Sequence, residues 1–266
     1  MATSASNTIC VIGAGHMGLA IVRGLLKSGI PSRRITVATP HTEKAKSVAS
    51  RGVTVVTDNA RGVTSARVVI LAVKPTMVLD IVKSLGTQLK SKTIVSVAAG
   101  VQLKKIISAA PSAKAVFRIM PNLPVASGKG VIGIYGGKST SGAIELLMKR
   151  LGTVIHVKRE EELDALTLVS GCGPGVVAYV ISILEDEARR RGFSARDAET
   201  IAVETFAGTI AELRDSSVSS RELMKAVATK GGVTESIIAH LEKKGTGRTF
   251  RRAYEQGMRK IKSIRA

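Results

Sequence analysis

The chain of 266 residues has few aromatic side chains: four Phe, three Tyr and no Trp. So few rings leave little surface on which nucleic-acid bases stack. Acidic residues are also few, 20 against 40 Lys and Arg, and the formal net charge is +20. This excess of cations supplies the electrostatic part of phosphate binding, yet no nucleic-acid-binding motif accompanies it. We therefore expect the charge to attract small anions, and we do not expect a nucleic-acid partner.

Cysteine, histidine and long apolar runs are scarce as well. The two cysteines, Cys10 and Cys172, have no second Cys nearby in sequence, which favours a reducing compartment over a disulfide framework. The four histidines are widely spaced and show no metal-ligand pattern, so we expect no metal. No uninterrupted apolar run reaches the roughly 20 residues of a membrane span, and only seven residues precede the first predicted strand. We predict a cytoplasmic protein without a membrane partner.

A glycine motif near the N-terminus is the first positive signal. The apolar residues 8–12 lead directly into Gly-Ala-Gly-His-Met-Gly at 13–18. In a dinucleotide-binding turn, the three glycines serve the tight turn, the close approach of backbone to phosphates and the packing of helix on strand. The following residues, 17–28, have apolar side chains at helical spacing and end at Gly29, with Pro31 just beyond. This strand, turn and helix predict a pyrophosphate site.

The rest of the first half alternates between short apolar strands and helices, and the second half is predicted to be helical. This pattern predicts an α/β fold: a Rossmann-type, doubly wound and mostly parallel sheet over 1–158, then an all-helical domain over 159–266. The helices carry more apolar surface than one face needs, so they pack either on a second subunit or on one another. The acidic run at 160–162 is most simply the first turn of a helix. The strands are predicted at 33–39, 67–73, 93–98, 115–119, 131–135 and 154–157, and the later helices at 141–151, 175–191, 195–214, 221–228, 234–243 and 249–264.

The segment after the second strand bears on the choice of cofactor. It reads Thr-Pro-His-Thr-Glu-Lys over 39–44, with no acid at the strand end to hold a ribose 2′-hydroxyl. An acid there favours NAD and repels a 2′-phosphate. The donors in this segment favour NADPH, with NADH as the alternative; an ordinary polar turn would have the same composition.

Six short motifs in order, followed by a seventh, resemble those of the pyrroline-5-carboxylate reductase family. The resemblance runs from about residue 8 through the helical half. It implies a Rossmann domain and a helical domain through which two subunits interlock, often within a ring of dimers. It also implies NAD(P)H-dependent reduction of a C=N bond, giving L-proline in the last step of proline biosynthesis. The motifs are Gly-Ala-Gly-x-Met at 13–17, Asp-Asn at 58–59, Ala-Val-Lys-Pro at 72–75, Ala-Ala-Gly at 98–100, Met-Pro-Asn at 120–122, Ser-Gly-Cys-Gly-Pro at 170–174 and Gly-Gly-x-Thr at 231–234.

The resemblance also assigns site residues. A threonine matching Thr234 is placed to hydrogen-bond the ring nitrogen of the imine, so Thr234 is the predicted catalytic residue. The residues predicted to surround the substrate are Thr229, Gly231, Gly232, Val233 and Thr234. The residues predicted to meet the cofactor are Gly13, Ala14, Gly15, His16, Met17, Thr39, Asn59, Ala72, Val73, Lys74, Pro75, Ala99, Gly100 and Asn122.

The helical half lacks a residue that ketone reduction needs. Hydroxyacid dehydrogenases of similar architecture protonate an alkoxide, typically with a lysine after the glycine-rich segment, but this chain has no lysine between Lys158 and Lys225. An imine that enters protonated accepts hydride without that acid, so positioning and a hydroxyl suffice.

Three positions depart from the family pattern. Lys230 replaces a proline, Val176 replaces a tyrosine, and Ser217 stands where many members have Glu. Another cyclic imine acid or a small keto acid therefore stays open as the substrate. A non-catalytic, basic nucleotide-binding protein is the remaining alternative.

Overall fold

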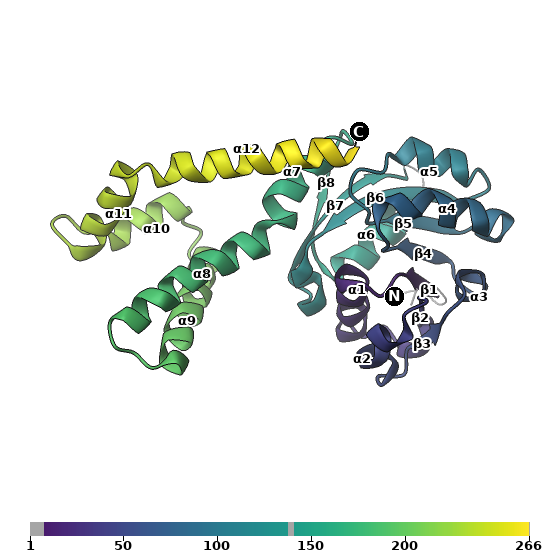
Figure 1. The fold of residues 1–266 in the computed structure, drawn as a ribbon, viewed down its shortest axis with the longest axis horizontal. Helices are drawn as coiled ribbons and strands as arrows, with labels where there is room; N and C mark the ends of the chain where they lie inside the picture. The colour runs from purple at the N-terminus through teal and green to yellow at the C-terminus, as the bar shows by residue number, and fades with distance from the viewer. Residues whose placement is uncertain (1–7, 138–140, 266) are drawn as a thin grey trace. The chain divides into compact units, whose positions relative to one another are not determined.

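The computed structural model describes residues 8–137 and 141–265, which form two compact units (Figure 1). The first is built on the chain up to residue 174 together with the residues from 260 onward, and the second comprises 175–259. The first unit extends beyond 158, where the sequence predicts a domain boundary. Its added helix α7 (Glu162–Leu166) contacts two strands of the sheet, β6 and β7.

An eight-stranded sheet forms the first unit, with the strand order β3-β2-β1-β4-β5-β6-β7-β8. All neighbouring strands are parallel except β6 and β7, so the predicted Rossmann-type, mostly parallel sheet is confirmed. Strand β3 was not predicted, because it has three residues at a sheet edge and none is fully buried. The strands are β1 (Ile9–Ile12), β2 (Ile35–Ala38), β3 (Thr54–Val56), β4 (Val68–Leu71), β5 (Thr93–Ser96), β6 (Ala115–Pro121), β7 (Gly130–Gly136) and β8 (Gly152–His156).

Two apolar cores cover the two faces of the sheet because successive strand residues alternate between them. One core joins the strands to α1 and α6, and the other joins them to α3, α4 and α5. Strand β4 is buried along its whole length, as expected for the centre of a parallel sheet. Helices of this unit are α1 (His16–Lys27), α2 (Lys46–Ala49), α3 (Asn59–Val63), α4 (Pro75–Leu85), α5 (Leu103–Ala109), α6 (Ser141–Lys149) and α7, with 3₁₀ turns η1 (Ser32–Arg34), η2 (Thr42–Ala45), η3 (Gly86–Leu89) and η4 (Leu123–Ser127) and the π-helical turn η5 (Thr167–Gly171).

Five helices follow, and they supply the second unit. Ser194 caps α9, with its hydroxyl accepting from Asp197 N at 3.1 Å. A reciprocal capping box of Ser219 and Glu222 starts α10. The helices are α8 (Gly173–Arg190), α9 (Ala195–Asp215), α10 (Ser220–Val227), α11 (Val233–Lys243) and α12 (Thr246–Arg265).

The second unit leaves most of its apolar side chains exposed. Within 175–259, the buried apolar side chains that the structure describes are three alanines: Ala188, Ala198 and Ala202. The continuous helical stretch Glu162–Arg190 contains a window with mean hydropathy 1.7, none of it buried. By length and composition alone, this stretch is long and apolar enough to cross a membrane. An exposed apolar surface of this kind marks a region that another surface covers.

Candidate cofactor and substrate sites

The turn from β1 into α1 has the geometry expected of a pyrophosphate site. Gly13 has φ +108°, and a Cβ there would collide with the carbonyl oxygen of Ala72. A Cβ on Gly18 would likewise collide with the carbonyl oxygen of Gly13. A Cβ on Gly15 would meet no atom within 4 Å in the part of the chain that the structure describes. Two glycines therefore serve the protein's own packing, while Gly15 leaves open space at the start of α1, where helix N–H groups attract anions.

The predicted cofactor residues of the first unit come together at the carboxyl edge of the sheet. Backbone hydrogen bonds continue the strand ladder past each strand end: Gly13 N donates to Ala38 O and Ala72 N to Ile12 O, both at 2.8 Å. The order of the strands reverses between β1 and β4, which is where dinucleotides bind in such sheets. The residues after β1, β2, β4, β5 and β6 and at the start of α3 thus share one edge, and their role as cofactor contacts stays a prediction.

The segment after β2 is a tight polar turn. Thr39 is buried, and its hydroxyl accepts from His41 N at 3.2 Å. Lys44 lies exposed in η2, and no carboxylate stands at the strand end itself. The segment offers donors to a ribose or its phosphate, and the preference for NADPH stays a prediction.

Asn122 has a structural role that the sequence did not reveal. Its side chain is buried, its Oδ1 accepts from Val131 N at 2.9 Å, and its Nδ2 donates to the Ser170 hydroxyl and carbonyl at 3.1 and 3.2 Å. The amide therefore joins the β6–β7 connection to η5. Asn122 stays a predicted cofactor contact, and its hydrogen bonds also fix the β6–β7 connection against η5.

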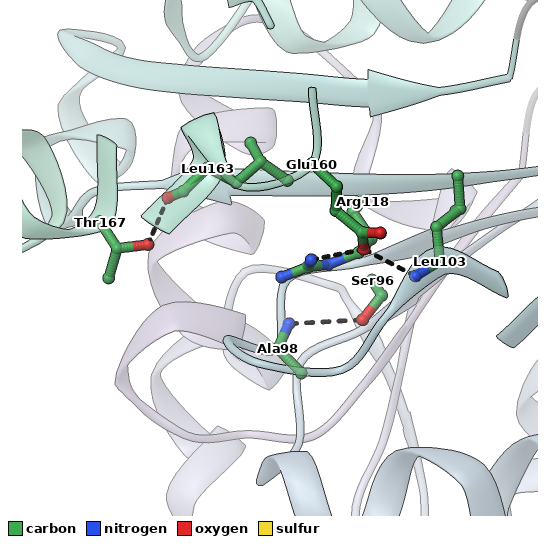
Figure 2. A network of polar contacts seen from close by, with 7 residues as sticks. All are labelled: Ser96, Ala98, Leu103, Arg118, Glu160, Leu163 and Thr167. Carbon is green, nitrogen blue, oxygen red and sulfur yellow. Dashed lines mark hydrogen bonds and ion pairs between the residues drawn. The ribbon is translucent and has the colours of Figure 1, made fainter. Parts of the chain in front are cut away.

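A buried ion pair lies on the α5 side of the sheet (Figure 2). Arg118, in the middle of β6, is 1% exposed, and its Nη1 lies 2.6 Å from Glu160 Oε1. The interpretation of 160–162 as a helical first turn is wrong for Glu160, since α7 begins at Glu162 and Glu160 turns inward instead. A charged residue within the apolar run Val-Phe-Arg-Ile-Met is the sequence signal that pointed to a buried partner.

The predicted substrate residues lie together in the turn between α10 and α11, in the second unit. Gly231 has φ +74°, and its N–H donates to the Glu235 carboxylate at 2.6 Å. Gly232 N donates to Thr229 O at 2.9 Å. Thr234 lies half-buried in the first turn of α11, and Lys230 is exposed. The sequence analysis missed Glu235, which holds the Gly-Gly turn closed.

Metal ligands are not clustered in the described structure: no group of three or more His, Cys, Asp or Glu is placed to hold an ion in residues 8–137 and 141–265. Cys10 is buried, and burial raises the pKa of its thiol to about 12. Its side chain is therefore an apolar part of the core rather than a nucleophile.

A Rossmann-type sheet with an open glycine turn at its switch point defines the class of protein: a dinucleotide-binding oxidoreductase. Comparison with known proteins agrees, because the family described as "NADP oxidoreductase coenzyme F420-dependent" matches residues 8–100 and the family described as "Pyrroline-5-carboxylate reductase dimerisation" matches 160–264. The pyrroline-5-carboxylate reductase of Pisum sativum is 33% identical over 91% of this chain and 90% of its own length. The chain belongs to the pyrroline-5-carboxylate reductase family.

Solved structures show the same fold over the whole chain. A pyrroline-5-carboxylate reductase from Coxiella burnetii is 28% identical, with a TM-score of 0.86 over 98% of this chain and 99% of that one. The Plasmodium falciparum pyrroline carboxylate reductase with NADP bound is 22% identical, with a TM-score of 0.88 over the same shares.

Proposed function

We propose that this chain is a pyrroline-5-carboxylate reductase, which transfers hydride from NADPH, or less readily from NADH, to the cyclic imine and releases L-proline. The proposal is carried by the glycine turn of residues 13–18, which leaves room for a pyrophosphate, in a chain that belongs to this family. The lack of an acid after β2 supports the preference for NADPH.

The reaction needs little general acid–base catalysis from the protein. A bound nicotinamide dinucleotide supplies the hydride, and an imine that is already protonated needs no lysine acid. The Thr234 hydroxyl, in the first turn of α11, is proposed to hydrogen-bond the ring nitrogen. The remaining turn residues, Thr229 and Gly231 to Val233, are proposed to surround the substrate, with the Thr229 hydroxyl at its carboxylate. Catalysis then rests on orientation and electrostatics.

Assembly completes the proposal. The match of 160–264 to a dimerisation family and the exposed apolar side chains of α8 to α11 support a homo-oligomer. Its form is proposed to be an interlocked dimer, alone or as part of a ring of dimers. The apolar stretch Glu162–Arg190 is then subunit contact rather than a membrane span. We propose a soluble, cytoplasmic enzyme on this basis.

A substrate panel with both cofactors tests the activity. The purified chain is expected to oxidise NADPH faster with pyrroline-5-carboxylate than with piperideine-2-carboxylate or small keto acids. Faster turnover of a six-membered imine or a keto acid would replace the proposed substrate. Salt-dependent DNA or RNA binding without any NADPH oxidation would instead favour the non-catalytic alternative.

The role of Thr234 is tested by two substitutions. Thr234→Ala is expected to lower kcat by about 100-fold, as removing one transition-state hydrogen bond does, while the Kd for NADPH stays within about twofold. Thr234→Ser keeps the hydroxyl and is expected to retain most of the activity. Equal kcat for Thr234→Ala and the wild type would refute this role.

A further inference from the structure

The loop between β5 and α5, residues 97–102, is held at both ends by side chains from elsewhere in the first unit or from β5 itself. At its start, Ala98 N donates to the Ser96 hydroxyl at 3.4 Å. At its end, Leu103 N donates to Glu160 Oε1 at 2.7 Å (Figure 2). The second contact joins positions 57 residues apart in sequence. The loop's outer end is therefore set by a carboxylate that the chain brings back after completing the sheet.

The carboxylate of Glu160 is itself held by Arg118. The same Oε1 atom that accepts from Leu103 lies 2.6 Å from Arg118 Nη1. Arg118 Nε and Nη2 are buried and have no hydrogen-bond partner within residues 8–137 and 141–265. A buried guanidinium needs a counter-charge, and Glu160 supplies the ion pair that the structure shows for it. This fixes the carboxylate at a defined place above the sheet.

This loop matters because of where it lies. It follows β5 at the carboxyl edge and carries Ala99 and Gly100, two predicted cofactor contacts; Gly100 has φ +80°. The glycine turn at 13–18, the predicted pyrophosphate site, follows β1, and the polar segment 39–44, predicted to face the ribose, follows β2. A dinucleotide lying across the edge then extends its other half over the ends of β4 and β5.

We propose that Glu160 is a positioning residue for the cofactor: by accepting from Leu103 N, and fixed by Arg118, it sets the 97–102 loop against the nicotinamide half of the dinucleotide. The inference rests on the proposed function, since it needs a nicotinamide dinucleotide at this edge. It gives a chemical role to the first residue of the segment that matches the dimerisation family.

Two double variants separate positioning from folding. Replacing one partner alone leaves a buried charge unpaired and lowers stability, so both partners are changed together. Arg118→Met/Glu160→Gln removes the ion pair and keeps an amide oxygen to accept from Leu103 N. Arg118→Met/Glu160→Leu removes the same ion pair and leaves no acceptor. Glu161→Gln, one residue away and exposed, is the control.

Four measurements are made on the full chain: the melting temperature, the Kd for NADPH by fluorescence, the hydrogen exchange of the 97–103 amides, and the steady-state kinetics with NADPH and the imine. The Gln-containing double variant is expected to bind NADPH like the wild type. The Leu-containing variant is expected to melt at a similar temperature but to bind NADPH about tenfold more weakly. Its Leu103 amide should exchange faster, and its kcat/KM for NADPH should fall by a larger factor than its KM for the imine rises.

Equal NADPH affinity and equal exchange in the two double variants would overturn the positioning role and leave the proposed function intact. A wild-type chain that binds no NADPH would overturn both.

Discussion

The two units of the molecule differ in how they bury their apolar residues. The first unit closes two cores around its sheet, and side chains as large as Phe117, Ile21 and Leu71 are fully covered. The helices of the second unit bury three alanines among their described apolar residues, while Ile183, Ile210 and Ile237 are 44–56% exposed. The first unit thus completes its core within one chain.

The two units therefore differ in the source of their folding stability. Burial of apolar surface is the main favourable term in folding, at about 25 cal/mol per Å². Helices that leave their large apolar side chains outside gain little of it alone. The match of 160–264 to a dimerisation family supports a homo-oligomer, so we expect another copy of the chain to cover this surface. Folding of the second unit and assembly are therefore expected to be one event.

The largest effect is expected from a charge placed on the apolar surface of the second unit. Ile210→Asp, on α9, would bury a carboxylate against the second copy without a partner, at a cost of about 3 kcal/mol or more than about 100-fold in association. Light scattering is expected to show monomers, and imine reduction should be lost. NADPH binding by the first unit should persist, because that unit has its own core.

Glu199→Gln on the same helix, an exposed position that is already polar, is the control and should leave assembly unchanged. A stable, fully active monomer of Ile210→Asp would contradict the comparison. So would loss of NADPH binding at a temperature where the first unit remains folded.

A smaller, more local effect is expected within the first unit. Replacing one glycine of the turn by alanine should lower stability, and replacing another should lower the affinity for NADPH. Gly18→Ala places a methyl group against the carbonyl oxygen of Gly13, so unfolding should become easier by about 1–3 kcal/mol. Gly15→Ala meets no described atom and has φ −74°, so stability should stay the same or rise slightly. Its methyl group would occupy the place of the pyrophosphate and weaken NADPH binding about tenfold.

Thermal unfolding and NADPH titration of the two variants check this. Oligomer size serves as the control and should not change in either, because both changes lie in the first unit. If Gly15→Ala bound NADPH with wild-type affinity, the pyrophosphate would not lie at the start of α1.

Much of the fold could be predicted because its signals are local. The turn at 13–18 and the apolar strand at 68–71 each depend on a few neighbouring residues, and the structure confirms them. Strand β3 was missed because it has three residues at the edge of the sheet, too few to show a strand period.

The site could be predicted only where a motif lies next to a strand end. Arg118 and Glu160 are 42 residues apart, and their pairing depends on how β6 and the segment before α7 meet in space. Likewise, the sequence showed that Asn122 follows a strand, but its bonds to Val131 and Ser170 come from the antiparallel β6–β7 connection and the π-helical turn η5. Long-range polar contacts of this kind leave no periodic trace.

The smallest effect is expected at the two thiols, which both lie in the first unit but differ in exposure. Cys10 lies inside the completed core of the first unit, where burial raises the pKa of its thiol to about 12, so the thiol stays protonated at pH 8. Cys172 is exposed in the single chain, within the segment that matches the dimerisation family.

A disulfide reagent at pH 8 is expected to leave Cys10 unlabelled until the protein unfolds. Labelling of Cys172 should be slower in the wild-type oligomer than in monomeric Ile210→Asp, if the second copy covers that surface. In the Cys172→Ser variant, Cys10 is the remaining thiol. Rapid labelling of Cys10 under native conditions would show that the first unit opens by itself far more often than a closed core allows.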